Sequence, residues 1–142
     1  MKRKTPLAPV GHMLECAEWA ISYIDGMGKE DFLEDRRTQQ AVIMNLLIIG
    51  EMASRLARDH AEFWEKYPQA PWREMTSMRN RIAHGYFDLR LDTIWDTAST
   101  SLPELISIVK PIFDELAASH AVEGRPGDDA AFKVAGLDDK TN

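Results

Sequence analysis

The segment from residue 31 to residue 57 constrains the fold most strongly, because its hydrophobic residues recur with the period of an α-helix. A helix is predicted here that begins near Asp31 or Asp35 and ends at Ala57. One stripe, at steps of four, three, four and three, consists of Val42, Leu46, Ile49, Ala53 and Leu56. Ile43 and Leu47 form another apolar flank. The helix therefore needs cover on more than one side, from its own chain or from a dimer partner.

Two further segments predict helices on either side of this one. Apolar residues recur at three- and four-residue steps over residues 11–27, and Gly26 and Gly28 are expected to end this helix. Another helix is expected from Pro71, which suits a first helical turn, to His84. Gly85 is expected to adopt the left-handed conformation and close that helix. The aromatic residues between the second and third helices are interpreted as core anchors in a short connection.

A last helix is expected to begin near residues 91–93, with Asp92 as its N-cap. Pro103 and Pro111 fall inside its pattern, so this helix should be kinked at Pro103 or broken into two segments, and we prefer the kink. Residues 1–119 are predicted to form one domain and residues 120–142 a flexible acidic tail. Because no segment alternates like a strand, the predicted class is all-α, an antiparallel up-and-down bundle of four to five helices.

Composition narrows the classes of function. The 142 residues carry a net charge of -6, which argues against a broad basic surface that holds nucleic acid. Any nucleic-acid chemistry must therefore be local. The single cysteine and four scattered histidines lack metal-ligand spacing, so neither a metal nor another cofactor is expected. The lone thiol and the absence of a spanning or signal pattern favour a cytoplasmic protein that does not enter a membrane.

The stretch "MRNRIAHGYF" at residues 78–87 places several polar and charged side chains close together at the predicted end of the third helix. Its polar side chains are Arg79, Asn80, Arg81, His84 and Tyr86. Arg79 and His84 are five residues apart, about 140° around an ideal helix, so they do not converge automatically. They can meet if the last turn unwinds at Gly85, or across a two-fold axis between two chains.

These residue types suit RNA cleavage without a metal. That reaction needs a base for the 2′-hydroxyl, an acid for the departing 5′-oxygen and a cation beside the phosphorane. His84 could be the acid or base, since the end of a helix favours the imidazolium. Arg79 could clamp the phosphate. The alternative is purely structural: a histidine cap, a surface ion pair and a packing tyrosine.

"RNRIAHGY" resembles the signature of the HEPN superfamily, in which an Arg, a polar residue and a His four to six residues beyond the Arg form the active site. A Tyr two residues after the His is the form found in HepT-like toxins. "HMLECAEWAISYI" is similar to the first helix of that family and "FLEDRRTQQAVIMNLLIIGEMASRL" to its second. "WREMTSMRNRIAHGYFDLRLDTIWDT" resembles the third helix and the start of the fourth. The resemblance covers roughly residues 10–117.

The resemblance implies an all-helical homodimer whose paired motifs face each other in a cleft. It implies a metal-independent endoribonuclease, the toxin of a type VII-like toxin–antitoxin system, with RNA as its substrate. Arg79 and His84 would be catalytic and Asn80 would support the phosphate or the histidine. A minimal nucleotidyltransferase antitoxin would transfer AMP to Tyr86, with a larger hetero-oligomer left open. Glu51, in "IGEM", is interpreted as a helix-surface or capping carboxylate.

Two other functions stay open at this point. The chain could be a non-catalytic interaction module that a nucleotidyltransferase binds and modifies, in which case Tyr86 matters and His84 only shapes the recognition site. It could also be a plain dimeric scaffold. Cleavage of RNA before any modification separates the first hypothesis from both.

Overall fold

The computed structural model describes residues 5–123, and all regular structure in that range is helical. In chain order the elements are α1 (Leu7–Tyr23), α2 (Lys29–Leu33), α3 (Arg36–Asp59), α4 (Phe63–Lys66), α5 (Trp72–His84), the 3-10 turn η1 (Tyr86–Asp88), α6 (Leu91–Asp96), the π-helical segment η2 (Thr97–Ser101) and α7 (Leu102–Glu123). The predicted all-α class is confirmed. The last helix continues past the predicted domain end at residue 119, and the rest of the predicted tail, from residue 124, lies outside the described residues.

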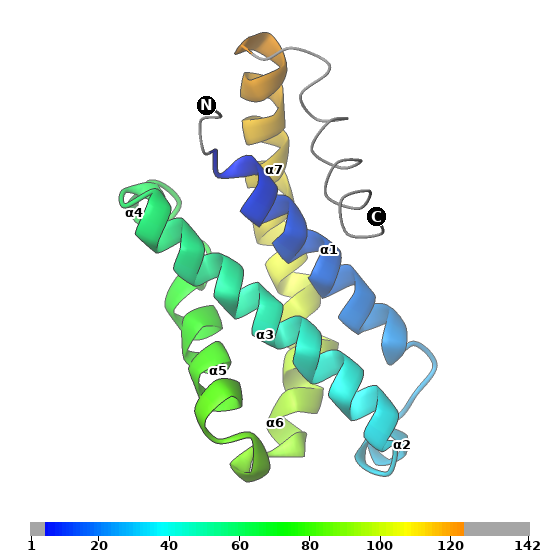
Figure 1. The fold of residues 1–142 in the computed structure, drawn as a ribbon. Helices are drawn as coiled ribbons and strands as arrows, with labels where there is room; N and C mark the ends of the chain where they lie inside the picture. Colours follow the sequence, from blue (N-terminus) through cyan, green and yellow to red (C-terminus); the bar gives the residue numbers. More distant parts are fainter. Residues whose placement is uncertain (1–4, 124–142) are drawn as a thin grey trace, which may run out of the picture.

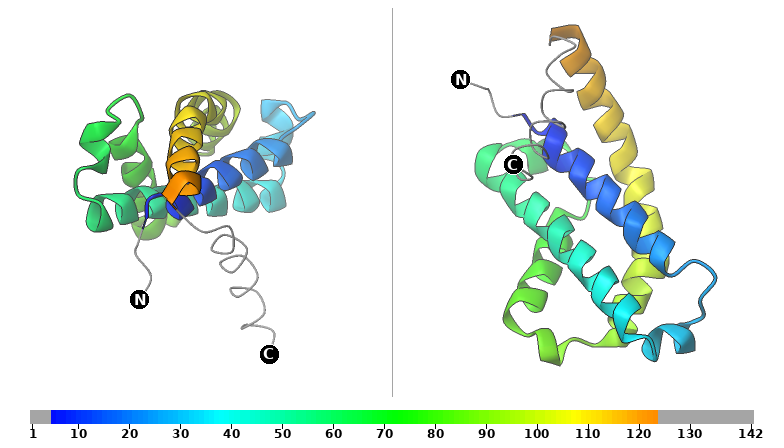
Figure 2. Two further views of the ribbon diagram at one scale, coloured as in Figure 1. Left: turned by 90° about the horizontal axis from the view of Figure 1, so that it is seen from above. Right: turned by 45° about the vertical axis from the view of Figure 1, so that its right-hand side comes forward.

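The helices form two layers (Figures 1 and 2). α1 and α3 lie side by side in the front layer of Figure 1, and α5 and α7 lie behind them. α3 packs against α1 on one side and against α5 on another, while α7 packs against α1. The predicted cover of α3 on more than one side is therefore supplied within the chain.

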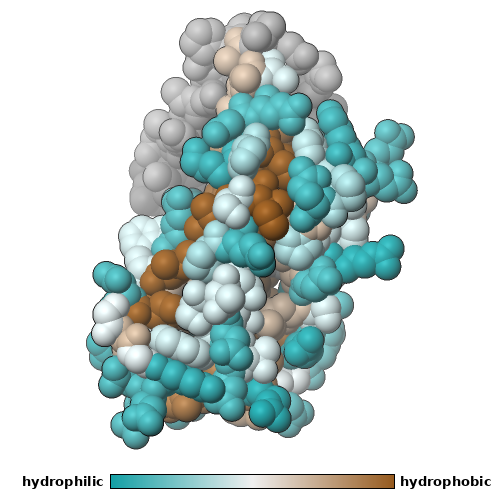
Figure 3. Space-filling model, turned by 180° about the vertical axis from the view of Figure 1, so that it is seen from behind, coloured by the Kyte–Doolittle hydropathy of each residue, from teal (hydrophilic) through white to brown (hydrophobic). Residues whose placement is uncertain are grey.

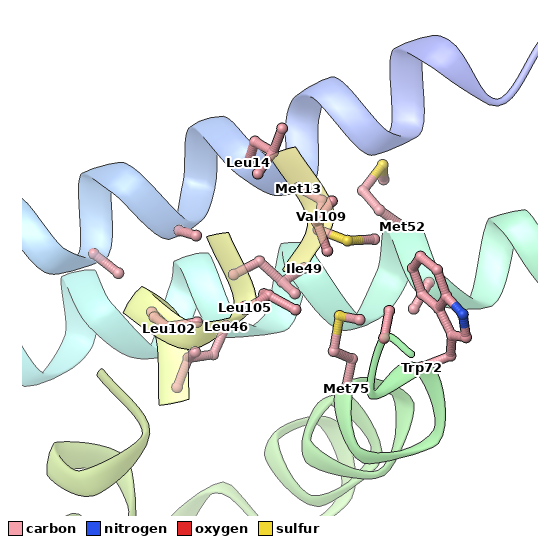
Figure 4. Close-up of a cluster of buried hydrophobic side chains, with 14 of the residues drawn as sticks. Met13, Leu14, Leu46, Ile49, Met52, Trp72, Met75, Leu102, Leu105 and Val109 are labelled. Carbon is pink, nitrogen blue, oxygen red and sulfur yellow. The ribbon is translucent and has the colours of Figure 1, made fainter. Parts of the chain in front are cut away.

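Side chains from α1, α3, α5 and α7 meet in one hydrophobic core (Figure 4). All five residues of the predicted α3 stripe are buried: Val42, Leu46, Ile49, Ala53 and Leu56. Burial of a Val, Leu or Ile side chain contributes about 1.5–3 kcal/mol. The stripe therefore makes α3 the central helix of the bundle.

The apolar length of α3 follows from this central position. Among the described helices, α3 is the one whose length and hydropathy would allow it to cross a membrane. The mean hydropathy of its most apolar window is 1.2, and 44% of that window is buried inside the protein. Its contacts with α1 and α5 account for this composition, because a core helix needs apolar residues on several sides.

The N-terminus of α3 is fixed by Asp35, one of the two predicted starting points. The Thr38 backbone N–H donates to Asp35 Oδ1 at 3.1 Å, and the Thr38 hydroxyl donates to Asp35 Oδ2 at 2.8 Å. These bonds satisfy a free donor of the first helical turn. The hydroxyl and backbone hydrogen bonds from Thr38 lower the pKa of Asp35.

The Asp35 cap is expected to lose its stabilising effect in acid. Because the folded pKa is lowered, the contribution is complete above the unfolded value of about 3.9 and is lost as pH falls through the folded pKa. Asp35→Asn keeps a capping oxygen without the ionisation. We expect the difference in Tm between wild type and Asp35→Asn, followed by circular dichroism, to shrink from about pH 6 to about pH 2. A constant difference would contradict this.

The predictions for the capping residues of two helices are wrong. Gly85 has a φ of -153° and a ψ of 47°, not the left-handed conformation, because the chain continues directly into the 3-10 turn η1. Within residues 5–123, Gly26 is the one residue with a positive φ, at 81°. Asp92 is not the N-cap of α6, since Arg90 holds that place. Asp92 lies in the first turn and pairs with Lys29 at 3.6 Å, joining α6 to α2 at the surface.

The distortion predicted at Pro103 lies just before it, in the π-helical segment η2. The Leu102 N–H donates to the Thr97 carbonyl, five residues back, so the turn is wider than in an α-helix. The buried residues Ile94, Ala98 and Leu102 follow steps of four, which fits this wider turn. Pro103 has no N–H to continue an α-helical pattern at this point. Pro103 is the second residue of α7, whereas Pro111 lies in the interior of that helix.

Hydrophobic residues also reach the surface of the bundle. On the face opposite to that of Figure 1, they form a diagonal band bordered by hydrophilic residues (Figure 3). Other hydrophobic residues reach the surface on α3, which lies in the front layer of Figure 1. Met44 is 55% exposed there, and Leu47 and Ile48 are half-buried. The predicted second flank is thus partly covered, since Ile43 is buried in the chain while Leu47 stays half-open.

Candidate functional site

The cluster that ends α5 is positioned by the packing of α5 on α3. α5 begins directly after Pro71, which is its N-cap and not part of the first turn as predicted, and it ends at His84, as predicted. Its buried residues Trp72, Met75 and Ile82 join the core, and Asn80, Arg81 and His84 are left exposed. Unwinding of the last turn, one of the two ways in which Arg79 and His84 could meet, is not observed. α5 remains helical through His84, and the Gly85 N–H donates to the Arg81 carbonyl at 2.9 Å.

α3 and α5 approach each other most closely at Gly50. A Cβ added to Gly50 would collide with the Cβ of Arg79 and with the Met75 carbonyl oxygen. Gly50 is buried, so the absence of a side chain lets the α5 backbone lie directly on α3. This contact fixes where Arg79 leaves α5.

Arg79 is held against α3 by an ion pair. Its Nε donates to Glu51 Oε1 at 3.0 Å, and its Nη1 donates to Asn80 Oδ1 at 2.7 Å. The Arg79 side chain is 32% exposed and that of Glu51 40% exposed, so the pair adds little to stability. Its effect is on orientation: two donors are fixed, and Nη2 has no hydrogen-bond partner among the described residues.

Glu51 is the site residue that the sequence interpretation missed. It does lie on the surface of a helix, as expected, but its role as the partner of Arg79 was not predicted. The two residues are 28 positions apart, on different helices. No spacing within a helix can indicate such a pair, and only the close approach at Gly50 brings it about.

A cleft of about 590 Å³ lies beside the end of α5. Asn80, Arg81 and His84 line it from α5, Asp88 from η1 and Arg90 from the start of α6. Asn80 and His84 thus share one face, as their spacing of four residues predicts. The cleft brings a titratable imidazole, an amide and two guanidinium groups together on an otherwise acidic chain.

Two of the predicted site residues, Arg79 and Tyr86, do not line this cleft. Arg79 faces Glu51 on α3, as expected from its angular separation from His84 on an ideal helix. Tyr86 is 37% exposed in η1, and its ring meets that of Phe87 edge-to-face, with centroids 5.4 Å apart. The single chain therefore presents Arg79, the His84 cleft and Tyr86 as neighbouring but separate surfaces.

Metal ligands do not gather around these side chains. Within the part of the chain that the structure describes, no group of three His, Cys, Asp or Glu residues is placed to hold a metal ion. The chemistry that these residues can provide is proton transfer by His84 and charge stabilisation by arginine.

Known proteins with similar sequences identify the family. The sequence profile described as "Ribonuclease HepT-like" matches residues 13–112. A "Putative RNase" of Caldanaerobacter subterraneus subsp. tengcongensis is 36% identical over 112 residues, 79% of this chain and 97% of that protein. A "Putative RNase" of Methanocaldococcus jannaschii is 34% identical over 116 residues, 82% of this chain and 93% of that protein.

A third relative carries the family name itself. The "Probable ribonuclease HepT" of Thermococcus cleftensis is 42% identical over 76 residues, 54% of this chain and 66% of that protein. No solved structure matches the chain. The matched region contains α3, α5 and the Arg79–Tyr86 motif, all of which lie within residues 13–112. The chain belongs to the HepT-like ribonuclease family.

Proposed function

We propose that this protein is an endoribonuclease that cleaves RNA without a metal and acts as the toxin of a toxin–antitoxin pair. The observation that carries the proposal is the cleft at the end of α5, where His84 and Asn80 lie together beside an Arg79 that Glu51 orients. Family membership supports the ribonuclease activity, since the relatives are named as RNases.

His84 transfers one of the two protons of the reaction in this proposal, as general acid or general base. The 2′-oxygen of the RNA attacks the neighbouring phosphorus as a base removes its proton, and the bond from phosphorus to the 5′-oxygen breaks as an acid protonates that oxygen. His84 serves as one of these groups. Arg79 stabilises the phosphorane, because its guanidinium stays charged and can donate to two phosphate oxygens. The products are a 2′,3′-cyclic phosphate and a 5′-hydroxyl.

The complete site requires two chains in this proposal. Arg79 lies outside the cleft that contains His84 of the same chain, so a second copy would bring its own Arg79 to the scissile phosphate. The surface for this contact would lie next to Glu51 on α3. It is the partly exposed apolar flank that Met44, Leu47 and Ile48 form. We infer a homodimer formed through this flank and the end of α5.

The toxin is neutralised by modification in this proposal. Tyr86 is exposed in η1, two residues from His84, and is accessible to a nucleotidyltransferase antitoxin that transfers AMP. A bulky anionic nucleotide there would oppose RNA by charge and by volume. The pair would act in the cytoplasm, where reducing conditions keep the lone Cys16 free of disulfides. Burial raises the pKa of the Cys16 thiol, which favours its protonated form.

RNA cleavage by purified wild type and His84→Ala tests the function. We expect wild type to cleave RNA in excess EDTA and to arrest growth of a host that lacks the partner gene. His84→Ala is expected to lower cleavage by a factor of at least about 100, since a proton-transfer group is lost. Its Tm should match that of wild type, because His84 is exposed. Cleavage that needs a divalent metal, or that survives the substitution, would refute the proposal.

A second candidate function rests on the exposure of Tyr86 beside the cleft. The chain would then be a non-catalytic module that the nucleotidyltransferase binds and modifies, with ATP as the partner's substrate. Mass spectrometry after co-expression with the partner distinguishes the two. AMP on Tyr86 together with no RNA cleavage before modification favours the module, whereas cleavage by unmodified protein favours the toxin.

A further inference from the structure

The turn that follows α5 presents an aromatic ring that the proposed reaction does not use. Phe87 is 92% exposed, the highest value among the large hydrophobic residues of the described chain. Tyr86 meets it edge-to-face with an interplanar angle of 89°. The same turn joins two parts of the cleft wall, since Gly85 and Asp88 on either side of this pair both line it. Phe87 therefore lies on a turn whose two ends border the His84 cleft, although its ring is not part of the lining.

Two arginines border the same cleft. Arg81 forms no ion pair among the described residues. Arg90 is 78% exposed, and its nearest carboxylate is that of Asp92, at 3.9 Å. Asp88 is the one acidic residue in the lining, so the cleft has an excess of positive charge although the whole chain is acidic. Guanidinium groups placed in this way can bind phosphates of a nucleic-acid backbone.

We propose that Phe87 stacks on an unpaired RNA base while Arg81 and Arg90 bind the flanking phosphates. The inference rests on the proposed ribonuclease function and names its substrate as single-stranded RNA. A base can stack on a protein ring only when it is free of its own helix, and such stacking tolerates any base. The charged side chains of the neighbouring cleft, Arg81, Asp88 and Arg90, favour RNA over a protein partner, because docking surfaces for proteins have cores depleted of charge.

Binding of a probe that cannot be cleaved tests this inference separately from catalysis. The probe is a fluorescein-labelled single strand with a 2′-O-methyl group on every nucleotide, compared with its own duplex by fluorescence anisotropy. We expect wild type to bind the single strand at least about tenfold more tightly than the duplex. Phe87→Ala should weaken single-strand binding roughly tenfold, and Phe87→Trp should retain it.

The salt dependence separates stacking from charge. Arg81→Ala and Arg90→Ala should each lower the slope of log affinity against log salt by about 0.7, whereas Phe87→Ala should leave the slope unchanged. Two matched controls lie outside the cleft: Trp19→Ala, which removes an aromatic side chain 52% exposed on α1, and Arg73→Ala, which removes an exposed arginine from the first turn of α5. Neither is expected to change binding.

Each contrary outcome has a distinct meaning. Equal affinity for single strand and duplex, or unchanged binding by Phe87→Ala, overturns the inference. If Phe87→Ala changes the sedimentation mass and not RNA binding, the turn docks a protein and the inference is wrong. If wild type cleaves natural RNA while Phe87→Ala binds normally, the ribonuclease proposal alone survives. If binding depends on Phe87 and no RNA is cleaved, the stacking site stands and the ribonuclease proposal fails.

Discussion

Mixing the two inactive variants Arg79→Ala and His84→Ala is expected to restore roughly a quarter of wild-type RNA cleavage, if each site combines residues of two chains. Random exchange makes about half of the dimers mixed, and each mixed dimer keeps one intact site out of two. The structural reason is the direction of Arg79, which Glu51 holds on the α3 side of α5, outside the cleft that His84 lines.

A chain that carries both substitutions gives the reciprocal control. In a dimer with a wild-type chain, one composite site lacks Arg79 and the other lacks His84. The purified mixed dimer should therefore be inactive. If Arg79 and His84 of one chain formed the site, the same dimer would keep about half of the wild-type activity, and the two single variants would not complement each other. Chains with different affinity tags, co-expressed and purified in two steps, provide these dimers for a fluorescent RNA cleavage assay.

Gly50→Ala is expected to destabilise the fold by roughly 1–3 kcal/mol. The added Cβ would meet the Met75 carbonyl and Arg79 Cβ, so the α5 backbone must shift away from α3. This cost should exceed the gain of about 1 kcal/mol that alanine brings to a helix. The shift would also separate Arg79 from Glu51, so we expect cleavage to fall further than the loss of folded protein explains.

Gly11→Ala is the matched control for Gly50→Ala, since it also adds a methyl group to a glycine inside a helix. The nearest atoms to its Cβ would belong to the Phe113 ring, the closest at 3.1 Å, and a side chain can move where a backbone cannot. We expect urea unfolding to give a midpoint close to wild type for Gly11→Ala and a clearly lower one for Gly50→Ala. A Gly50→Ala protein with wild-type stability and activity would contradict the close approach.

The parts of this fold that sequence reasoning predicted are those where local chemistry and burial agree. The α3 stripe is buried because its apolar residues recur at the helical period and the helix is central. Asp35 and Pro71 precede α3 and α5 because Asp35 caps a helix and the fixed φ of a proline suits a helix start. Each of these signals acts within a few residues, so it can be read without the tertiary structure.

The parts that were missed depend on contacts between distant segments or on competing local geometries. The Glu51–Arg79 pair depends on the approach of α3 and α5 at Gly50. The end of α5 has a glycine that suits a left-handed closure, but the chain continues into a 3-10 turn instead. The roles of Arg79, Asn80, His84 and Tyr86 stay predictions, because the positions of side chains do not establish their chemistry.

The 3-10 turn η1 has a consequence for how this protein can evolve. None of its three residues, Tyr86–Asp88, is buried, so they add little to the core that holds the bundle together. Exchanges in such exposed positions usually change stability by less than about 0.5 kcal/mol. New residues in this turn could therefore be sampled one at a time without loss of folded protein. Ligand preference and antitoxin pairing could then diverge between relatives that share one scaffold.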